Sequence, residues 1–251
     1  MYFRQILHEE KSCASYLVGC PTLGVSAAVD PQGDPALYVQ RLDARGLRLT
    51  DVFETHLHAD HLSCARDLAR QTGATLHLGP GADVGYPHAP MTDGQVLTVG
   101  NRRIEVLHAP GHTPEHVCLL IDNWFVLTGD TLFVGDVGRV DLTLDHAHAL
   151  PVSRRAEQLF DSLQRLLALP DWTEIYPGHY SGSVCGRGMD GKPVSTIGRE
   201  RAKNKALRLD RAQFVDFQCS ELPPLPEDFR RIKSANAGLG TARVDDTNGR
   251  A

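Results

Sequence analysis

The sequence lacks any apolar run long enough to cross a membrane. Its first ten residues, MYFRQILHEE, lack the basic start and the apolar run that a secretory signal peptide carries. It also lacks a Cys-x-x-Cys pair, because its 6 cysteines are scattered along the 251 residues. These absences predict a cytoplasmic protein with no membrane partner, whose cysteines are free thiols rather than disulfides.

A strong excess of basic charge is also lacking, since the formal net charge is -5 and the isoelectric point is about 6.2. The basic residues between Arg199 and Lys205 form a local run, which is typical of a solvated helix face. We therefore expect no nucleic-acid partner. Hydrophobic residues make up 41% and charged residues 23%, as in ordinary globular proteins, and the chain is long enough to bury a sizeable core. We expect one domain over residues 1–251, with a short helical C-terminal tail from about residue 199.

Periodicity and turn residues divide the chain into short strands and a few helices. Their order favours an α/β (α+β) protein with two mixed β-sheets flanked by helices. The pattern alone leaves the connection of the strands open. Strands are predicted at 2–7, 15–18, 25–29, 49–54, 75–78, 96–99, 102–108, 117–121, 124–128 and 174–176, and helices at 35–45, 62–71, 145–169, 199–208 and 211–217.

The seven-residue stretch Thr-His-Leu-His-Ala-Asp-His (55–61) directly follows one predicted strand and contains three histidines and a carboxylate. Imidazole and carboxylate together suit divalent first-row metals. In an extended turn, residues two apart can point the same way, so His56 and His58 could share one metal. Asp60 and His61 follow as the chain turns into a helix, where they are better placed for a neighbouring second site.

Three further segments repeat one design, in which an apolar strand leads into a glycine turn that carries a potential ligand. The turns are Pro-Gly-His-Thr with His112, Gly-Asp with Asp130, and Pro-Gly-His with His179. Glycine lets the backbone turn sharply beside a ligand side chain. Ligands at the ends of several strands would converge on one sheet edge, where a rigid scaffold can hold a metal.

Other polar groups have a simpler expected role. His116 lies four residues after His112, and we expect it to support or cap the site rather than to bind the metal. Cys185 lies in a glycine-rich loop over residues 183–193, and a buried or free thiol is favoured over a thiol that takes part in sulfur transfer.

The ordered motifs THLHADH, PGHT, TGD and PGH resemble those of the metallo-β-lactamase superfamily, over nearly the whole chain as far as His179. The resemblance implies an αββα sandwich with a metal at the edge of the two sheets. Because this superfamily hosts many chemistries, finer features must indicate the reaction. The stretches GDTLF and GRVDL, and STIGRER further on, resemble the persulfide dioxygenase branch, and within it the subgroup found fused to rhodanese-type domains. A rhodanese-type sulfurtransferase would then be a separate partner chain.

This resemblance implies one Fe(II) per chain, bound by His56, His112 and Asp130. The substrates would be O2 and a low-molecular-weight thiol persulfide such as glutathione persulfide, and the products sulfite and thiol. Positions that hold a second metal in dinuclear relatives are kept, although the branch usually leaves that site empty. They are His58, Asp60, His61 and His179.

The same resemblance places Arg139 on the substrate side of the metal, where it would pair with a substrate carboxylate or form a structural ion pair with Asp141 or Asp136. Thr113 and Tyr180 are further candidate substrate contacts or packing residues. The family's His-Asp-Tyr around the last histidine is His-Tyr-Ser here, at residues 179–181, so a thiol other than glutathione is plausible. A homodimer is a family-level expectation.

Two alternatives stay open at this point. A thioester hydrolase of the glyoxalase II type would use the same ligands but fill two Zn sites, with a bridging hydroxide as nucleophile. The pattern that this branch carries near its last histidine is missing here. A non-catalytic iron or redox sensor would bind the metal without sustained turnover.

Overall fold

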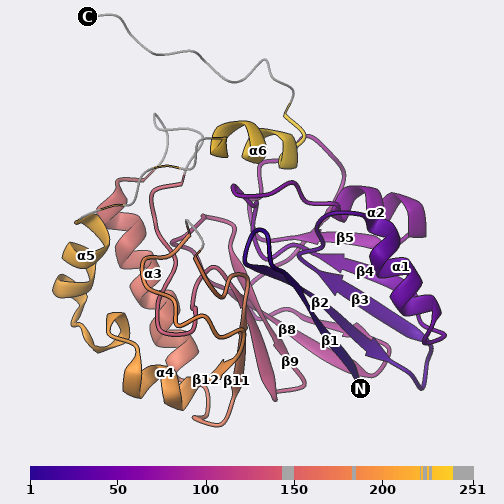
Figure 1. The fold of residues 1–251 in the computed structure, drawn as a ribbon, viewed down its shortest axis with the longest axis horizontal. Coiled ribbons are helices and arrows are strands. Elements are labelled where there is room, and N and C mark those ends of the chain that lie inside the picture. Colours follow the sequence, from indigo (N-terminus) through magenta and orange to yellow (C-terminus); the bar gives the residue numbers. More distant parts are fainter. Residues whose placement is uncertain (143–149, 183–184, 221, 223–224, 226–227, 240–251) are drawn as a thin grey trace, which may run out of the picture.

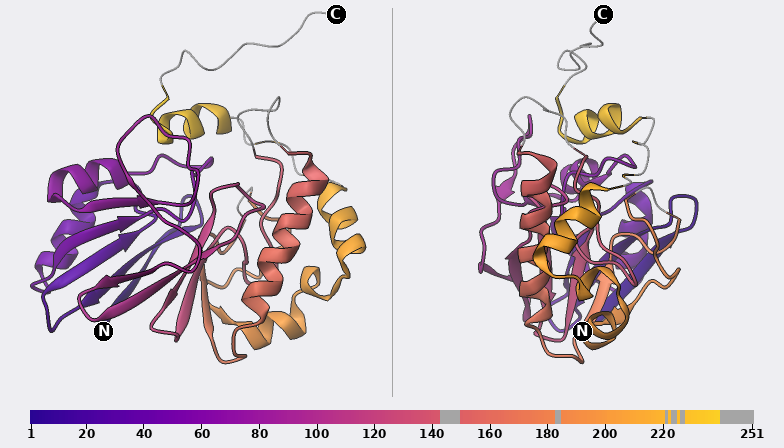
Figure 2. Two further views of the ribbon diagram at one scale, coloured as in Figure 1. Left: turned by 180° about the vertical axis from the view of Figure 1, so that it is seen from behind. Right: turned by 90° about the vertical axis from the view of Figure 1, so that its left-hand side faces the viewer.

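Two six-stranded mixed sheets lie face to face, and helices cover the outer face of each (Figures 1 and 2). The computed structural model describes residues 1–142, 150–182, 185–220, 222, 225 and 228–239. The strand order is β1-β2-β3-β4-β5-β6 in one sheet and β12-β11-β10-β9-β8-β7 in the other. The predicted αββα sandwich is therefore confirmed.

The first sheet begins with an antiparallel meander and continues with parallel strands. Two helices cover its outer face, and the first begins at the cap residue Asp34, whose side chain accepts from the amide of Ala36. The elements are β1 (Tyr2–His8), β2 (Cys13–Cys20), β3 (Val25–Val29), α1 (Pro35–Asp43), β4 (Arg48–Phe53), α2 (Ala65–Thr72), β5 (Thr75–Leu78) and β6 (Ala89–Pro90).

The second sheet is antiparallel from β7 to β10, and β11 then lies parallel to β10 after a crossover through α3. Helices α3, α4 and α5 cover its outer face (Figure 1). The elements are β7 (Val96–Val99), β8 (Arg102–His108), β9 (Val117–Ile121), β10 (Phe125–Gly129), α3 (Val152–Leu167), β11 (Glu174–Pro177), β12 (Ser195–Thr196), α4 (Ile197–Lys203), the 3-10 helix η1 (Ala206–Arg208), α5 (Arg211–Cys219) and α6 (Phe229–Asn236).

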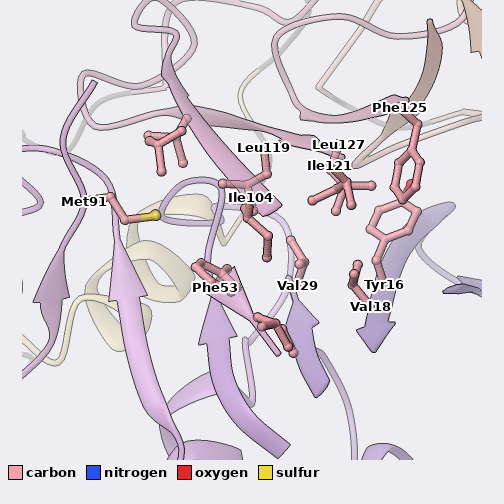
Figure 3. Packing of buried hydrophobic residues seen from close by; sticks show 14 of the residues in the cluster. Tyr16, Val18, Val29, Phe53, Met91, Ile104, Leu119, Ile121, Phe125 and Leu127 are labelled. Carbon is pink, nitrogen blue, oxygen red and sulfur yellow. The ribbon is translucent and has the colours of Figure 1, made fainter. Parts of the chain in front are cut away.

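The main core lies between the two sheets, where side chains from both interdigitate (Figure 3). Every residue of β2 is buried, because the strand is covered on both faces. Tyr16 and Val18 point to the facing sheet, while Leu17 packs under α1 and α2. This burial on both sides fixes the register of the strand, because a slip by one residue would exchange the two sets.

The predicted elements agree with the structure apart from their ends and three additions. Helix α2 begins at Ala65 rather than at residue 62, and the two-residue strands β6 and β12 were not predicted. The predicted helix over 199–208 is interrupted at Asn204, whose backbone is extended rather than helical. The side chain of Asn204 donates to the carbonyl of Asp136. The start of the predicted helix at 145 lies outside the described residues. Helix α6 was not predicted, since its short and highly charged sequence is held by tertiary contacts.

Within the described part of the chain, no helix has the length and apolar character that crossing a membrane would require.

Candidate metal centre

Four connections meet at one edge of the sandwich: the segment after β4, the turn after β8, the end of β10 and the turn after β11. They bring together one donor atom each from His56, His112 and Asp130, and these atoms all lie within 4.8 Å of one another. All three residues are at most 2% exposed. The structure therefore brings together, from segments far apart in the sequence, the three candidate ligands that the family resemblance implies.

A hydrogen-bond chain determines which nitrogen of His56 faces the centre. The hydroxyl of Thr55 donates to Oδ2 of Asp30 at 2.8 Å, so it accepts from Nδ1–H of His56 at 3.0 Å. The lone pair of His56 is consequently on Nε2, which lies 3.8 Å from Oδ2 of Asp130.

The same logic applies to His112. Its Nδ1 lies 2.7 Å from the backbone carbonyl of Arg139, and a carbonyl can only accept, so Nδ1 carries the proton. Nε2 of His112 then offers its lone pair, 3.5 Å from Oδ2 of Asp130. Outer partners that orient histidines in this way are typical of metal sites.

Three hydrogen-bond acceptors thus face one another in a buried space. Nε2 of His56 and Oδ2 of Asp130 have no hydrogen-bond partner among the described residues. An arrangement of acceptors without a donor is costly when it is buried, and a cation removes that cost. The residues therefore fit a divalent metal ion, which they would hold through two imidazole nitrogens and one carboxylate oxygen.

The pKa values agree with this use. Burial lowers the pKa of His56 well below its usual value, and burial likewise lowers the pKa of His112. Burial alone would raise the pKa of Asp130, but the charge and the hydrogen bond of His179 outweigh it and lower that pKa. Neutral imidazoles and an ionised carboxylate are the forms that bind metals.

His58 points away from this centre. Its Nε2 lies 2.9 Å from Oε2 of Glu54 and 3.3 Å from Oδ1 of Asp30. Burial opposes the charged form of His58, yet the two carboxylates hold its pKa well above the usual value. The spacing had suggested that His56 and His58 could share a metal. In the structure, the nearby Glu54 and the sequence-distant Asp30 direct His58 elsewhere.

The residues expected around a second metal are hydrogen-bonded to one another. His179 places Nδ1 2.8 Å from Oδ1 of Asp130 and Nε2 3.0 Å from Oδ2 of Asp60, so both of its nitrogens face carboxylates. Nδ1 of His61 lies 2.9 Å from the same Asp60 oxygen. Burial opposes protonation of His179, but the neighbouring charges of Asp130, Cys185 and Asp60 raise its pKa well above the usual value. In this arrangement His179 orients Asp130 rather than offering a lone pair.

The expected substrate contacts lie at different depths. Thr113 is buried beside His112, and its hydroxyl has no hydrogen-bond partner among the described residues. Arg139 is 1% exposed and forms a two-point pair with Asp141, with both N···O distances 2.6 Å. Tyr180 is half-buried, and its amide donates to the carbonyl of Ser12. The structural pair that we kept as one alternative for Arg139 is thus present.

Cys185 is buried, and its thiol lies within 4.8 Å of donor atoms of Asp60 and His179. Cys13 approaches the same carboxylate from β2, with Sγ 3.9 Å from Oδ2 of Asp60. Burial raises the pKa of Cys13, but hydrogen bonds to His179 and His61 outweigh this and bring it to about 7. Proximity of Cys13 to the site could not be read from its position in the sequence.

His116 has the supporting role that was expected for it. Its Nε2 accepts from the amide of Asp130 at 2.9 Å, and its Nδ1 lies 3.1 Å from the hydroxyl of Thr131. Glu115 was missed: its carboxylate accepts from the amide of Leu57 at 2.9 Å and so fixes the segment that carries His56.

Asn236, at the end of α6, was also missed. Its Nδ2 donates to the carbonyls of His58 (2.9 Å) and His61 (2.8 Å), and its Oδ1 accepts from the amide of Ser63 (3.0 Å). The C-terminal helix α6 thus holds the histidine segment (residues 55–63) through hydrogen bonds from a position about 175 residues further along the chain. Nothing in the local sequence indicates this contact.

We expect Asn236→Ala to lower the affinity for the metal by about tenfold, in the range that outer partners of metal ligands contribute. The reason is that three backbone groups of the histidine segment lose their partners, which also costs roughly 1–3 kcal/mol of stability. Metal titration and thermal unfolding measure the two effects. Arg231→Ala, an exposed change on the same helix, is the control. An unchanged metal affinity in a folded Asn236 variant would contradict this role.

Comparisons with known proteins agree with the geometry. A hydroxyacylglutathione hydrolase of Methylococcus capsulatus is 35% identical over an alignment of 217 residues, and the match covers 82% of this chain and 78% of that protein. The crystal structure of a metallo-beta-lactamase from Staphylococcus aureus has a TM-score of 0.87 and 32% identity, covering 95% of this chain and 72% of that one. The crystal structure of ETHE1 from Myxococcus xanthus has a TM-score of 0.83 and 31% identity, covering 96% and 100%.

The fold and the buried donor set define a protein of the αββα class with a candidate metal centre at the sheet edge. The model of the metallo-beta-lactamase superfamily matches residues 12–179, which include every motif of the centre. The chain belongs to the metallo-β-lactamase superfamily, and the relatives named above indicate an enzyme on this metal-dependent fold.

Proposed function

We propose that this chain is a persulfide dioxygenase, which uses one Fe(II) to oxidise the terminal sulfur of a low-molecular-weight thiol persulfide with O2. Two oxygen atoms of the sulfite product come from O2 and the third from water, which also releases the thiol. The observation that carries the proposal is the donor set at the centre. Two imidazole nitrogens and one carboxylate oxygen face one point, while the third nearby histidine, His58, is paired with carboxylates outside it. The sequence resemblance to the persulfide dioxygenase branch and the similarity to ETHE1 support it.

A two-histidine, one-carboxylate set is typical of non-haem Fe(II) oxygenases, because it leaves neighbouring positions open on the metal. When bound, Fe(II) would supply a cationic centre that orients and polarises the reactants. The protein contributes neutral imidazoles at His56 and His112 and a single carboxylate at Asp130. The site then keeps a net charge of about +1, counting iron as +2, which favours an anionic persulfide sulfur.

On the substrate side, we propose that the buried hydroxyl of Thr113 donates to the bound substrate, because it has no other partner among the described residues. Tyr180 and Arg139 remain proposed contacts. The two-point pair with Asp141 would hold the guanidinium of Arg139 in a fixed orientation beside the turn that carries His112.

A second candidate is a dinuclear zinc thioester hydrolase of the glyoxalase II type. The names of the curated relatives favour it, since the one described above is a hydroxyacylglutathione hydrolase. Asp60, His61 and His179 are also present for a second metal. In the structure, however, both nitrogens of His179 face carboxylates, so that site would have to rearrange before it could bind.

Metal analysis of anaerobically purified protein, with O2 uptake on glutathione persulfide and cysteine persulfide, tests the proposal. We expect about one Fe per chain, as the facial ligand set implies, and sulfite formed with O2 consumption. Two Zn per chain, hydrolysis of a glutathione thioester and no O2 uptake on either persulfide would instead establish the hydrolase. Metal binding with no turnover of any of these substrates would favour a sensor.

A further inference from the structure

His58 lies next to the candidate metal centre without belonging to it. Its ring centroid is 4.2 Å from that of His56, yet its donor atoms group with Asp30 and Glu54 rather than with His112 and Asp130. Both nitrogens of His58 are buried, and neither makes a hydrogen bond to a described residue; Nε2 is instead within ion-pair distance of the two carboxylates. An imidazole this close, on a short loop, would reach the centre by side-chain rotation if nothing held it.

Two buried carboxylates, those of Asp30 and Glu54, hold His58 away from the centre. Asp30 is fixed by the amide and the hydroxyl of Thr55, at 2.7 and 2.8 Å, so its two oxygens are already engaged. Glu54 accepts from the hydroxyl of Ser63 through one oxygen, and its other oxygen makes the shorter contact to His58, 2.9 Å against 3.3 Å for Asp30. Asp30, Glu54 and His58 are each at most 4% exposed.

Burying the carboxylate of Glu54 is costly unless a donor compensates it. It stands directly after β4, at 4% exposure, in a position where an apolar residue would continue the buried pattern of Val52 and Phe53. Its described partners are Ser63 and His58. The compensation of this buried charge therefore depends on the orientation of His58.

We infer that Glu54 is a positioning residue that keeps His58 out of the metal centre, and that it thereby selects a two-histidine, one-carboxylate ligand set. A third imidazole would create the three-histidine environment that suits tetrahedral zinc. Two histidines and one carboxylate suit Fe(II) with open positions. This inference rests on the proposed metal centre, and it makes Glu54 the determinant of which metal that centre prefers.

Glu54→Leu tests the inference, because leucine removes the nearer of the two carboxylate partners of His58 at similar volume. With Co(II) as a probe, we expect the wild type to show the weak visible absorption of a five- or six-coordinate ion. The variant should show the stronger absorption of a four-coordinate ion, and its Zn(II) affinity should rise by about tenfold, the scale of outer-partner effects. Adding His58→Ala to the variant should restore the wild-type spectrum and affinity. Asp67→Leu, at an exposed carboxylate of α2 that pairs with Arg70, is the control and should leave both unchanged.

An unchanged Co(II) spectrum in folded Glu54→Leu overturns the inference, and so does a loss of metal affinity in His58→Ala alone, because His58 would then already be a ligand. If thermal unfolding shows that the leucine variant does not fold, Glu54→Gln, which keeps the shape of the side chain, is measured against the same two outcomes. None of these titrations uses O2 or a persulfide. If the dioxygenase assay fails but the Co(II) spectra are as expected, only the proposed function is wrong. If the assay succeeds but the spectra are unchanged, only this inference is wrong.

Discussion

Asp130→Ala should leave the protein nearly free of metal and lower O2 uptake by about a thousandfold or more. A bound metal lowers the activation barrier by several kcal/mol, and each 1.4 kcal/mol of barrier is a factor of ten in rate. Asp130 supplies the only carboxylate oxygen of the donor set, and its other oxygen accepts from His179. Its removal therefore takes away a ligand and leaves His179 without one of its two carboxylates. Metal analysis and O2 uptake measure the effect.

Asp161→Ala is the matched control, since Asp161 is an exposed carboxylate on α3 that pairs with Arg211. It should keep the wild-type metal content and rate. His112→Ala should behave as Asp130→Ala does, because it removes one of the two imidazoles. If Asp130→Ala stays folded and still binds one metal ion as tightly as the wild type, the assignment of this ligand is wrong.

Gly111→Ala should destabilise the fold by about 3 kcal/mol and loosen the metal, because two costs add at this glycine. Its φ of 141° is a conformation that residues with a side chain rarely adopt. A Cβ there would also lie 2.5 Å from Cβ and 2.6 Å from Cα of Leu159, in the backbone of α3. The turn that carries His112 would have to move away from the helix. Chemical denaturation and metal titration report the two effects.

Gly94→Ala separates the two costs. Gly94 has a φ of 72°, but a Cβ there would meet nothing within 4 Å. It should therefore cost only about 1–2 kcal/mol, the price of the left-handed backbone alone, and leave metal binding unchanged. Equal losses of stability in the two variants would show that contact with α3 does not matter at Gly111.

The centre combines two kinds of histidine. His56 and His112 each have one nitrogen hydrogen-bonded to the protein and the other directed at the centre, whereas His58 and His179 are directed at carboxylates. Some of the partners that set the difference are close in sequence, namely Thr55 for His56 and Glu54 for His58. Others are remote, namely Arg139 for His112 and Asp130 for His179. These partners leave His56 and His112, with Asp130, as one candidate donor set among the seven potential ligands.

Much of the site was predictable because it depends on local order. Strands that end in glycine turns carried His112, Asp130 and His179 to one sheet edge, as the repeated pattern indicated. The alternation of apolar residues also predicted the layers, since each strand must bury one or both faces. Helix α6 was not predictable in this way, because it is held by contacts with the histidine segment rather than by its own propensity.

By itself, then, the sequence indicated the layered fold, because strand periodicity is a local property. Its short motifs carried the family resemblance that implies His56, His112 and Asp130 as metal ligands. Only the tertiary structure decided that His58 faces Glu54, that His179 lies between two carboxylates, and that Asn236 clasps the histidine segment. The physical reason is that a buried polar side chain takes the orientation in which its hydrogen bonds are satisfied or its charge is compensated. For His179 and Asn236 the partners lie in segments that only the folded chain brings together, and for His58 the choice of Glu54 over the centre depends on packing that the local sequence does not show.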